Sequence, residues 1–262
     1  PDNGYIRPAD TSTGGYAVSP DLHDRDDRLW AAVELALTSA DPGFIRQLER
    51  SNDPFLNENF FQSESFSGQL RWENTVSFPF VQAALQPVPG LDSSQQKRIR
   101  QQFLSYSQEL VKRIDQDGFG VALDKYYWGS TGGALAFGQM LIFASQLAPE
   151  NTEFLEGAIH QLHYVLGRNA LNSSFVSGVG HRYPRAIHHA VFANDDVEAI
   201  HPGLLAGGPN PNLDADETLP GYFDDSTPPA MCYVDHIDSW ASNENCILYN
   251  APLVAMAFFF SK

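Results

Sequence analysis

The sequence is poor in cysteine and in basic residues. Its 262 residues include two cysteines, and 16 lysines and arginines stand against 32 aspartates and glutamates. Cys232 and Cys246 are too few for a disulfide framework, so we expect two separate buried thiols, with a Cys232–Cys246 disulfide as the alternative. The formal charge of −16 argues against nucleic acid or an anionic membrane as a partner, because both repel an acidic protein.

Long apolar runs and alternating strand patterns are also lacking. No apolar run is as long as a membrane span, which takes about 20 residues. Few stretches alternate apolar and polar residues with period two, as half-buried strands do. Residues 1–10 read PDNGYIRPAD; they resemble neither a signal peptide nor a helix start, and we interpret them as the middle of a longer protein. Since 43% of the residues are hydrophobic, the chain should still fold around a large core.

Helical periodicity is what the sequence does contain. Apolar spacings of three and four residues or capping residues predict helices at 24–40, 74–85, 93–114, 131–147, 151–167 and about 242–260. The helix at 131–147 is apolar on nearly every side, so it should be buried. The pattern predicts an all-α fold with about six or seven helices and functional loops between them.

One connecting segment, 168–240, is too long to be a simple loop. It has about 70 residues, whereas structureless connections longer than about 15 residues are usually functional or disordered. Because it contains aromatic residues, which disordered segments avoid, we expect an ordered, site-building loop. It holds five of the eight histidines, namely His181, His188, His189, His201 and His236.

Three roles are open to these histidines. Metal binding is disfavoured, because neighbouring His188 and His189 point in different directions along an extended chain and the sequence has no HExxH or His-x-His spacing. A structural role is the usual one for a single histidine. The third role is in a carbohydrate site, where histidine and aromatic side chains hydrogen-bond to sugar rings and stack on them.

Two segments share their residues and spacing with a known enzyme family. Residues 164–189 read YVLGRNALNSSFVSGVGHRYPRAIHH, and residues 233–251 read YVDHIDSWASNENCILYNA. They closely resemble the first and second signatures of glycoside hydrolase family 9, a family of cellulases and related enzymes. Residues 126–133 and 26–36 resemble other family segments more weakly, so the resemblance covers nearly the whole chain.

The resemblance implies a fold and a reaction. The fold is an (α/α)6 barrel, of which this chain would supply roughly the C-terminal half to two-thirds. The reaction is inverting hydrolysis of β-1,4-glucosidic bonds in glucans or short β-oligosaccharides, with no required cofactor. Because polymeric glucan lies outside the cell, we expect a secreted or periplasmic protein.

The resemblance also implies roles for residues of the two signatures. Glu244 matches the general acid, Asp235 the signature aspartate near it, and His188 the histidine at the sugar next to the cleaved bond. Ala190 stands where the family usually has an arginine, which puts the specificity of that subsite in doubt. Cys246 replaces a smaller residue, which we interpret as a packing change.

Further residues are expected to bind substrate or metal. Tyr249 matches a tyrosine that helps to hold the sugar and the water, and Trp128 and, more weakly, Trp72 are expected sugar-stacking platforms. A structural calcium site is the other expectation, because some family members bind calcium near the matching segment. Its hard oxygen ligands would be Asp24, Asp26 and Asp27. The alternative for these acids is to stabilise a helix N-terminus.

Three carboxylates precede the apolar final helix: Asp235, Asp238 and Glu244. An inverting glycosidase needs one protonated and one ionised carboxyl about 6.5–9.5 Å apart, with a water between them. The start of a helix favours the charged form of a glutamate, whereas crowding by other carboxylates favours the protonated form that a general acid needs. We therefore expect the cluster to keep Glu244 protonated; the alternative is an acid that only stabilises the helix.

The partner of Glu244 is missing from the sequence. In the family the base belongs to an Asp-x-x-Asp motif, commonly Asp-Ala-Gly-Asp, far upstream of both signatures. Residues 21–24, 24–27 and 235–238 fit the bare spacing but lack the glycine context. We therefore expect residues 1–262 to be the C-terminal part of a single catalytic domain, with its N-terminal part as a partner. Alone, the chain should be unstable, because apolar faces such as that of 133–144 would be exposed.

Three function classes remain open. The first is an inverting β-glycosidase, either a cellulase-like endo-β-1,4-glucanase or an exo-acting β-glucosidase or glucosaminidase. The second is a non-catalytic glycan-binding fragment. The third is an unrelated all-α protein with accidental signatures. An Asp-x-x-Asp segment that accompanies this chain would separate the first class from the second.

Overall fold

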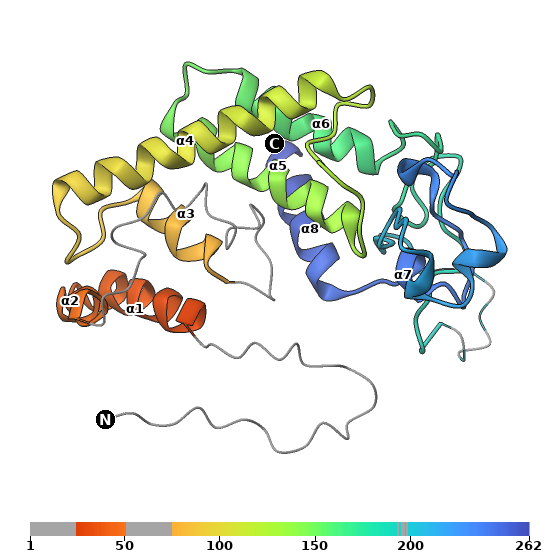
Figure 1. The fold of residues 1–262 in the computed structure, drawn as a ribbon, viewed down its shortest axis with the longest axis horizontal. Coiled ribbons are helices and arrows are strands. Elements are labelled where there is room, and N and C mark those ends of the chain that lie inside the picture. Colours follow the sequence, from red (N-terminus) through yellow and green to blue (C-terminus); the bar gives the residue numbers. More distant parts are fainter. Residues whose placement is uncertain (1–24, 51–74, 193, 195–196, 198, 262) are drawn as a thin grey trace. The chain divides into compact units, whose positions relative to one another are not determined.

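The structure is a computed structural model that describes residues 25–50, 75–192, 194, 197 and 199–261 (Figure 1). These residues form helices and loops with no β-strand, which confirms the all-α prediction. None of the described helices is both long enough and apolar enough to cross a membrane. The chain divides into two compact units, residues 1–103 and 104–262, which we describe separately.

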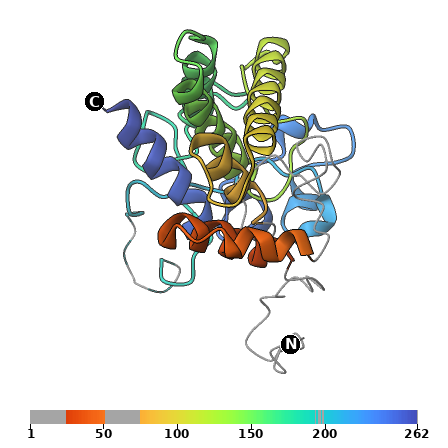
Figure 2. The ribbon, with the colours of Figure 1, turned by 90° about the vertical axis from the view of Figure 1, so that its left-hand side faces the viewer.

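The first unit is built from short helices. They are α1 (Arg25–Ser39), α2 (Gly43–Arg50), α3 (Ser77–Leu85) and the first turns of α4 (Ser93–Gln116). Helix α1 packs against both α2 and α3 (Figure 2). Its acidic first turn suits the positive end of the helix dipole, and its apolar stripe, including Leu29 and Val33, is buried.

In the second unit, α5 (Ser130–Leu147) is the central helix. It packs against α6 (Glu153–Val165) and α8 (Ile247–Phe260), which lie beside it in Figure 1. Most of its residues are buried, among them Leu135, Phe137 and Met140. The prediction that the helix at 131–147 is buried is therefore confirmed. The expectation that its face at 133–144 is exposed in the chain alone is wrong, because α6 and α8 cover this helix.

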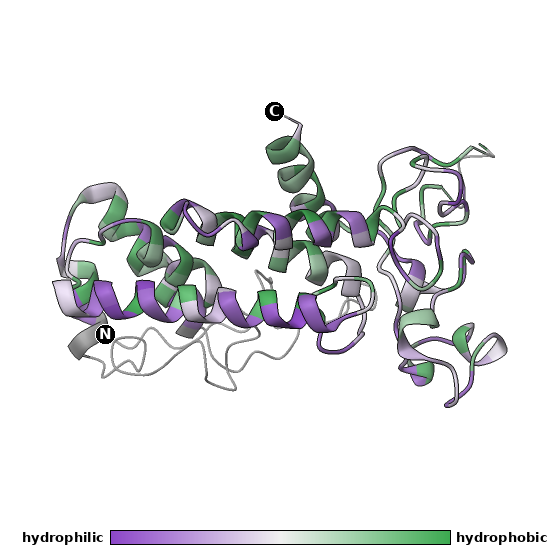
Figure 3. Cartoon of the chain, turned by 90° about the horizontal axis from the view of Figure 1, so that it is seen from above, coloured by the Kyte–Doolittle hydropathy of each residue, from purple (hydrophilic) through white to green (hydrophobic). Residues whose placement is uncertain are grey.

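The exposed apolar surface of this unit lies on α8 instead. Ile247 is 85% exposed and Val254 64%, and Leu248 and Phe259 are each more than a third exposed. Figure 3 shows that α8 is hydrophobic along most of its length. One side of α8 packs on α5, and the other side is an exposed apolar surface. Folded proteins usually cover a surface of this kind.

The final helix begins later than the sequence predicts. Residues 240–243 form the single turn α7 (Trp240–Asn243), residues 244–246 are not helical, and α8 starts at Ile247. The physical reason is a competition for carbonyl groups. The carbonyl oxygens of Ser242, Asn243 and Glu244 accept hydrogen bonds from backbone N–H groups of other loops, so they are not available to a continuous helix.

The described part of the segment between α6 and α7 is held by hydrogen bonds and contains three short 3₁₀ turns. The turns are η3 (Leu213–Ala215), η4 (Leu219–Gly221) and η5 (Pro229–Met231). Its described residues contribute buried apolar side chains such as Phe175, Ile187 and Leu205. These residues support the prediction of a structured, site-building loop.

Candidate active site

Glu244 lies in the non-helical link between α7 and α8. Its backbone is extended, with φ −66° and ψ 143°, and it forms the C-cap of α7. The sequence placed it at the start of a helix, and this expectation is wrong. The positive end of the α8 dipole therefore does not act on Glu244 as it would on a residue of the first turn.

Trp128 binds the side chain of Glu244. The indole Nε1–H of Trp128 donates a hydrogen bond of 3.0 Å to Oε2 of Glu244. Trp128 is 39% exposed, so part of this residue is accessible to solvent. The structure thus brings together two predicted site residues that stand far apart in the sequence.

Tyr249 packs against Gly129, the residue that follows Trp128. Gly129 is the N-cap of α5 and has φ +80°, a conformation that favours glycine. A Cβ at this position would lie 2.5 Å from Cε1 of Tyr249, so the tyrosine ring packs directly on the backbone next to Trp128. Tyr249, Trp128 and Glu244 therefore converge at the N-terminal end of α5.

A strap at 206–209 ties the start of α5 to the backbone of Glu244. The N–H of Thr131 donates to the carbonyl oxygen of Gly207 (3.0 Å), and the N–H of Gly207 donates to the carbonyl oxygen of Glu244 (2.8 Å). The hydroxyl groups of Ser130 and Thr131 donate to the carbonyl oxygens of Pro209 and Ala206. Sequence reasoning missed this strap; its only signal is a glycine pair before a proline in the long loop.

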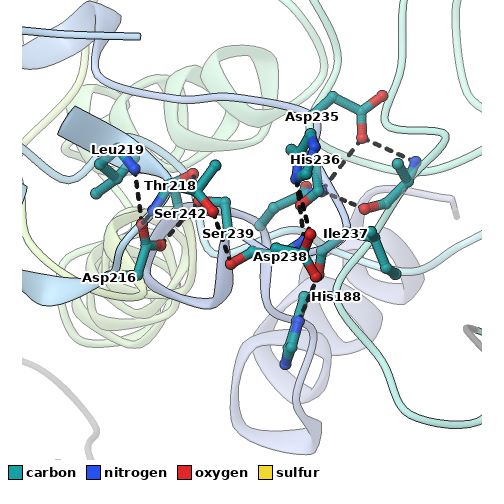
Figure 4. A network of polar contacts seen from close by, with 12 residues as sticks. His188, Asp216, Thr218, Leu219, Asp235, His236, Ile237, Asp238, Ser239 and Ser242 are labelled. Atoms are coloured by element: carbon teal, nitrogen blue, oxygen red, sulfur yellow. Dashed lines mark hydrogen bonds and ion pairs between the residues drawn. The ribbon is translucent and has the colours of Figure 1, made fainter. Parts of the chain in front are cut away.

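His188 lies beside Glu244 and has a fixed tautomer. Its N–H donates to the carbonyl oxygen of Asn243 (3.0 Å), and it forms an isolated parallel bridge with Glu244. Its ring Nδ1 is 2.5 Å from the carbonyl oxygen of Ile237 (Figure 4). A carbonyl oxygen only accepts, so Nδ1 carries the hydrogen and Nε2 is left for a ligand.

The carboxylate of Asp235 holds the loop that carries His188. It accepts hydrogen bonds from the backbone N–H groups of Arg185 (2.7 Å) and Ala186 (2.9 Å) and from the side-chain amide of Asn243 (3.2 Å). These contacts support a positioning function in this chain. The role in catalysis that the resemblance gives to Asp235 stays a prediction.

Asn243 is a buried hub that sequence reasoning missed. Its amide N–H groups donate to Asp235 and to the carbonyl oxygen of Ala186, and its Oδ1 accepts from the hydroxyl of Tyr233 (2.7 Å). Burial of the hydroxyl, and then the charge of Asp235, raise the pKa of Tyr233 well above its usual value. The Tyr233 hydroxyl therefore keeps its proton and remains a donor to Asn243.

A buried carboxylate, Asp216, fixes the start of α7. It accepts four hydrogen bonds, from the N–H groups of Thr218, Leu219 and Ala241 and from the hydroxyl of Ser239 (Figure 4). Sequence reasoning did not single it out, because two of its partners, Ser239 and Ala241, lie more than 20 residues further along the chain.

The two other carboxylates near Glu244 in sequence have partners of their own. Asp235 holds the His188 loop, and Asp238 is exposed, with Oδ2 3.8 Å from Nδ1 of His236. The Glu244 carboxylate accepts a hydrogen bond from Trp128. Crowding of Glu244 by carboxylates stays a prediction.

Both cysteines are free thiols. Cys232 is buried and Cys246 is half-buried at the N-cap of α8, so the prediction of two separate thiols is confirmed. Burial raises the pKa of both thiols, and both are therefore protonated at neutral pH. Neither is an activated nucleophile.

The structure describes only some of the remaining predicted site residues. Trp72 and Asp24 lie outside the described residues. Asp26 and Asp27 both accept from the hydroxyl of Thr75, at 3.2 and 3.3 Å, and Asp26 also accepts from its N–H. Among the described residues no three histidine, cysteine or acidic side chains gather as metal ligands would. The hydrogen bonds of Asp26 and Asp27 to Thr75 fit a structural role, and calcium binding stays a prediction.

Comparison with known proteins decides the family. Residues 3–257 match the model of glycosyl hydrolase family 9. The chain belongs to this family. Endoglucanase D of Acetivibrio thermocellus is 30% identical over 255 residues, which are 97% of this chain and 36% of that enzyme. The cellodextrinase of Butyrivibrio fibrisolvens is 29% identical over 260 residues, which are 95% of this chain and 46% of that enzyme.

Solved structures of family 9 show the same fold. The crystal structure of the family 9 endoglucanase J30 matches with a TM-score of 0.80 and 30% identity, over 91% of this chain and 42% of that one. The structural neighbours are (α/α)6 barrels, so the fold prediction is confirmed. This chain spans less than half the length of each of these three proteins.

Proposed function

We propose that this chain is the C-terminal part of an inverting β-1,4-glucan hydrolase in which Glu244 is the general acid. The observation that supports it is the position of the Glu244 carboxyl. It is bound by Trp128, which is partly exposed, and its backbone lies beside that of His188. A hydrogen-bonded carboxyl next to an aromatic ring and a histidine is an arrangement suited to a sugar ring and its leaving group.

The proposed reaction uses Glu244 once per bond cleaved. The protonated carboxyl of Glu244 gives its proton to the glycosidic oxygen, and the bond between this oxygen and the anomeric carbon breaks. A water on the opposite face of the sugar attacks the anomeric carbon, and a second carboxylate, about 6.5–9.5 Å from Glu244, takes the proton of that water. Nε2 of His188 would accept a hydrogen bond from a sugar hydroxyl.

The second carboxylate is proposed to come from the N-terminal part of the same domain. This chain carries no Asp-x-x-Asp segment with the family's glycine context, and its relatives are more than twice as long. The exposed apolar side of α8 supports a missing neighbour that covers it. Without that part, the site would bind glycans and not cleave them, which is the second candidate function.

Substrate and location are proposed from the relatives. Endoglucanase D is named for cleavage within glucan chains, and the cellodextrinase for cleavage of short oligomers. We therefore propose β-1,4-glucans or their oligomers as substrates, with endo action or exo action as alternatives. A polymeric substrate would require the enzyme to be secreted or periplasmic.

The test is Glu244→Gln in the complete catalytic domain. The amide keeps the shape of the side chain and removes the transferable proton, so kcat on cellotetraose should fall by about 10²–10⁴-fold. Binding of cellotetraose, measured by calorimetry, should change little. Glu217→Gln is the matched control, because Glu217 is an exposed glutamate of the same loop system. Turnover of cellotetraose by Glu244→Gln at the wild-type rate would refute the assignment.

A further inference from the structure

The hydrogen bond between Trp128 and Glu244 constrains which carboxyl oxygen can carry a proton. An indole N–H is a donor only, and it cannot exchange roles with its acceptor. Oε2 of Glu244 therefore accepts from Nε1 at 3.0 Å whether or not the carboxyl is protonated. The hydroxyl oxygen of a carboxylic acid is a weaker acceptor than its carbonyl oxygen, so the favourable position for the proton is Oε1.

The backbone segments that carry the donor and the acceptor are both held by the fold. The backbone next to Trp128 makes a left-handed turn at Gly129, which packs against the Tyr249 ring. The backbone of Glu244 is fixed by Gly207, whose other hydrogen bond holds Thr131 in the first turn of α5. A donor that is preorganised in this way loses little energy in reorganisation when charge develops on its acceptor.

We propose that Trp128 is a positioning residue, which holds the Glu244 carboxyl by Oε2 so that Oε1 delivers the proton to the glycosidic oxygen. This inference rests on the proposed function of Glu244. As the O–H bond at Oε1 breaks and the leaving oxygen takes the proton, Glu244 becomes a carboxylate. The indole hydrogen bond then becomes charge-assisted and stronger, so it stabilises the transition state more than the ground state.

Trp128→Phe tests the role of the N–H and retains an aromatic ring for stacking. On cellotetraose, whose leaving group needs a proton, we expect kcat to fall by about 10- to 100-fold with KM within about threefold. On 2,4-dinitrophenyl β-cellobioside, whose leaving group needs no proton, the rate should fall less than about threefold. The ratio of the two rates is measured on one preparation, so loss of folded protein cancels from it.

Two further variants complete the experiment. Trp128→His can place its Nε2–H where the indole N–H lies, so it should recover most of the rate on cellotetraose. Trp30→Phe is the matched control, because the indole of Trp30 also donates a 3.0 Å hydrogen bond to a glutamate, Glu34, on α1. It should change neither rate by more than about twofold.

The outcomes separate this inference from the proposed function. Suppose that Glu244→Gln is inactive on cellotetraose but the rates of Trp128→Phe on the two substrates fall by the same factor. Trp128 then acts on sugar binding or folding, and the inference is overturned. It is also overturned if Trp128→Phe keeps its full rate on cellotetraose. If Glu244→Gln itself remains active, the proposed function fails, whatever Trp128→Phe shows.

Discussion

The buried carboxylate of Asp216 accepts a hydrogen bond of 2.9 Å from the backbone N–H of Ala241, and this contact anchors the first turn of α7. Its other donors are the N–H groups of Thr218 and Leu219 and the hydroxyl of Ser239. Since α7 leads directly into Glu244, the stability of this turn governs the position of the proposed acid.

Asp216→Asn should therefore destabilise the protein. The amide group replaces one acceptor oxygen with a donor, which faces N–H or O–H groups that also donate, and an unsatisfied buried group of this kind costs about 1–3 kcal/mol. We expect a decrease of this size in the free energy of unfolding of the complete domain, measured with urea. Asp214→Asn, on the exposed side of the same loop, is the control. Equal stability of the two variants would contradict the anchoring role.

Two variants of His188 test the roles of its two ring nitrogens separately. Asn can place its amide N–H near the position of Nδ1, and Gln can place its amide near the position of Nε2. His188→Asn should keep the hydrogen bond to Ile237 and the melting temperature, but lose sugar affinity. His188→Gln should do the reverse, with a lower melting temperature and better retained affinity. The comparison uses thermal unfolding and cellobiose binding, and the opposite ranking would show that Nδ1 does not carry the hydrogen.

The apolar side of α8 predicts behaviour that depends on the rest of the domain. If an N-terminal part covers Val254, then Val254→Asp buries a charge there and should destabilise the complete domain by about 3 kcal/mol or more. Leu155→Asp on α6, at a partly exposed leucine, should have a smaller effect, within about 1 kcal/mol. In the chain expressed alone, Val254→Asp should reduce aggregation. A monodisperse, fully active monomer of the unmodified 262-residue chain would refute the proposed N-terminal partner.

His160 predicts a dependence of stability on pH. Burial, and then the charges of Arg168 and His163, lower the pKa of His160, while Glu156 and Asp115 oppose the shift. Its Nδ1 is also buried without a hydrogen-bond partner among the described residues. The unfolded chain therefore binds a proton more readily than the folded chain, and stability should be lost as the pH falls below about 6.5 towards the lowered pKa. His160→Gln should flatten the unfolding free energy between pH 7.5 and 5; an unchanged slope would contradict this prediction.

The sequence predicted the helices well where local patterns decide them. The apolar run at 131–147 became α5, and the capped segment at 93–114 became the start and body of α4. The prediction failed at 242–260, because the hydrogen bonds that interrupt this helix come from loops such as that of Gly207. No local periodicity records such a competition.

The same limit applies to the site. The two signatures identified Glu244 and His188, and the structure places them side by side. Asn243 and Asp216 were missed, because their importance comes from burial and from partners far away in the sequence. The bond from Trp128 to Glu244 joins residues 116 positions apart, and only the fold can reveal it.

Gly207 also sets where this scaffold can be re-engineered. A side chain at this position would press to within 3.3 Å of the carbonyl oxygen of Ser242, and Gly208, with φ +89°, has even less space beside Thr131. The exposed turn at 224–226 meets no such restriction. Insertions that aim at new specificity should be placed in such turns. The segment 206–209, which links the start of α5 to Glu244, should keep its present length.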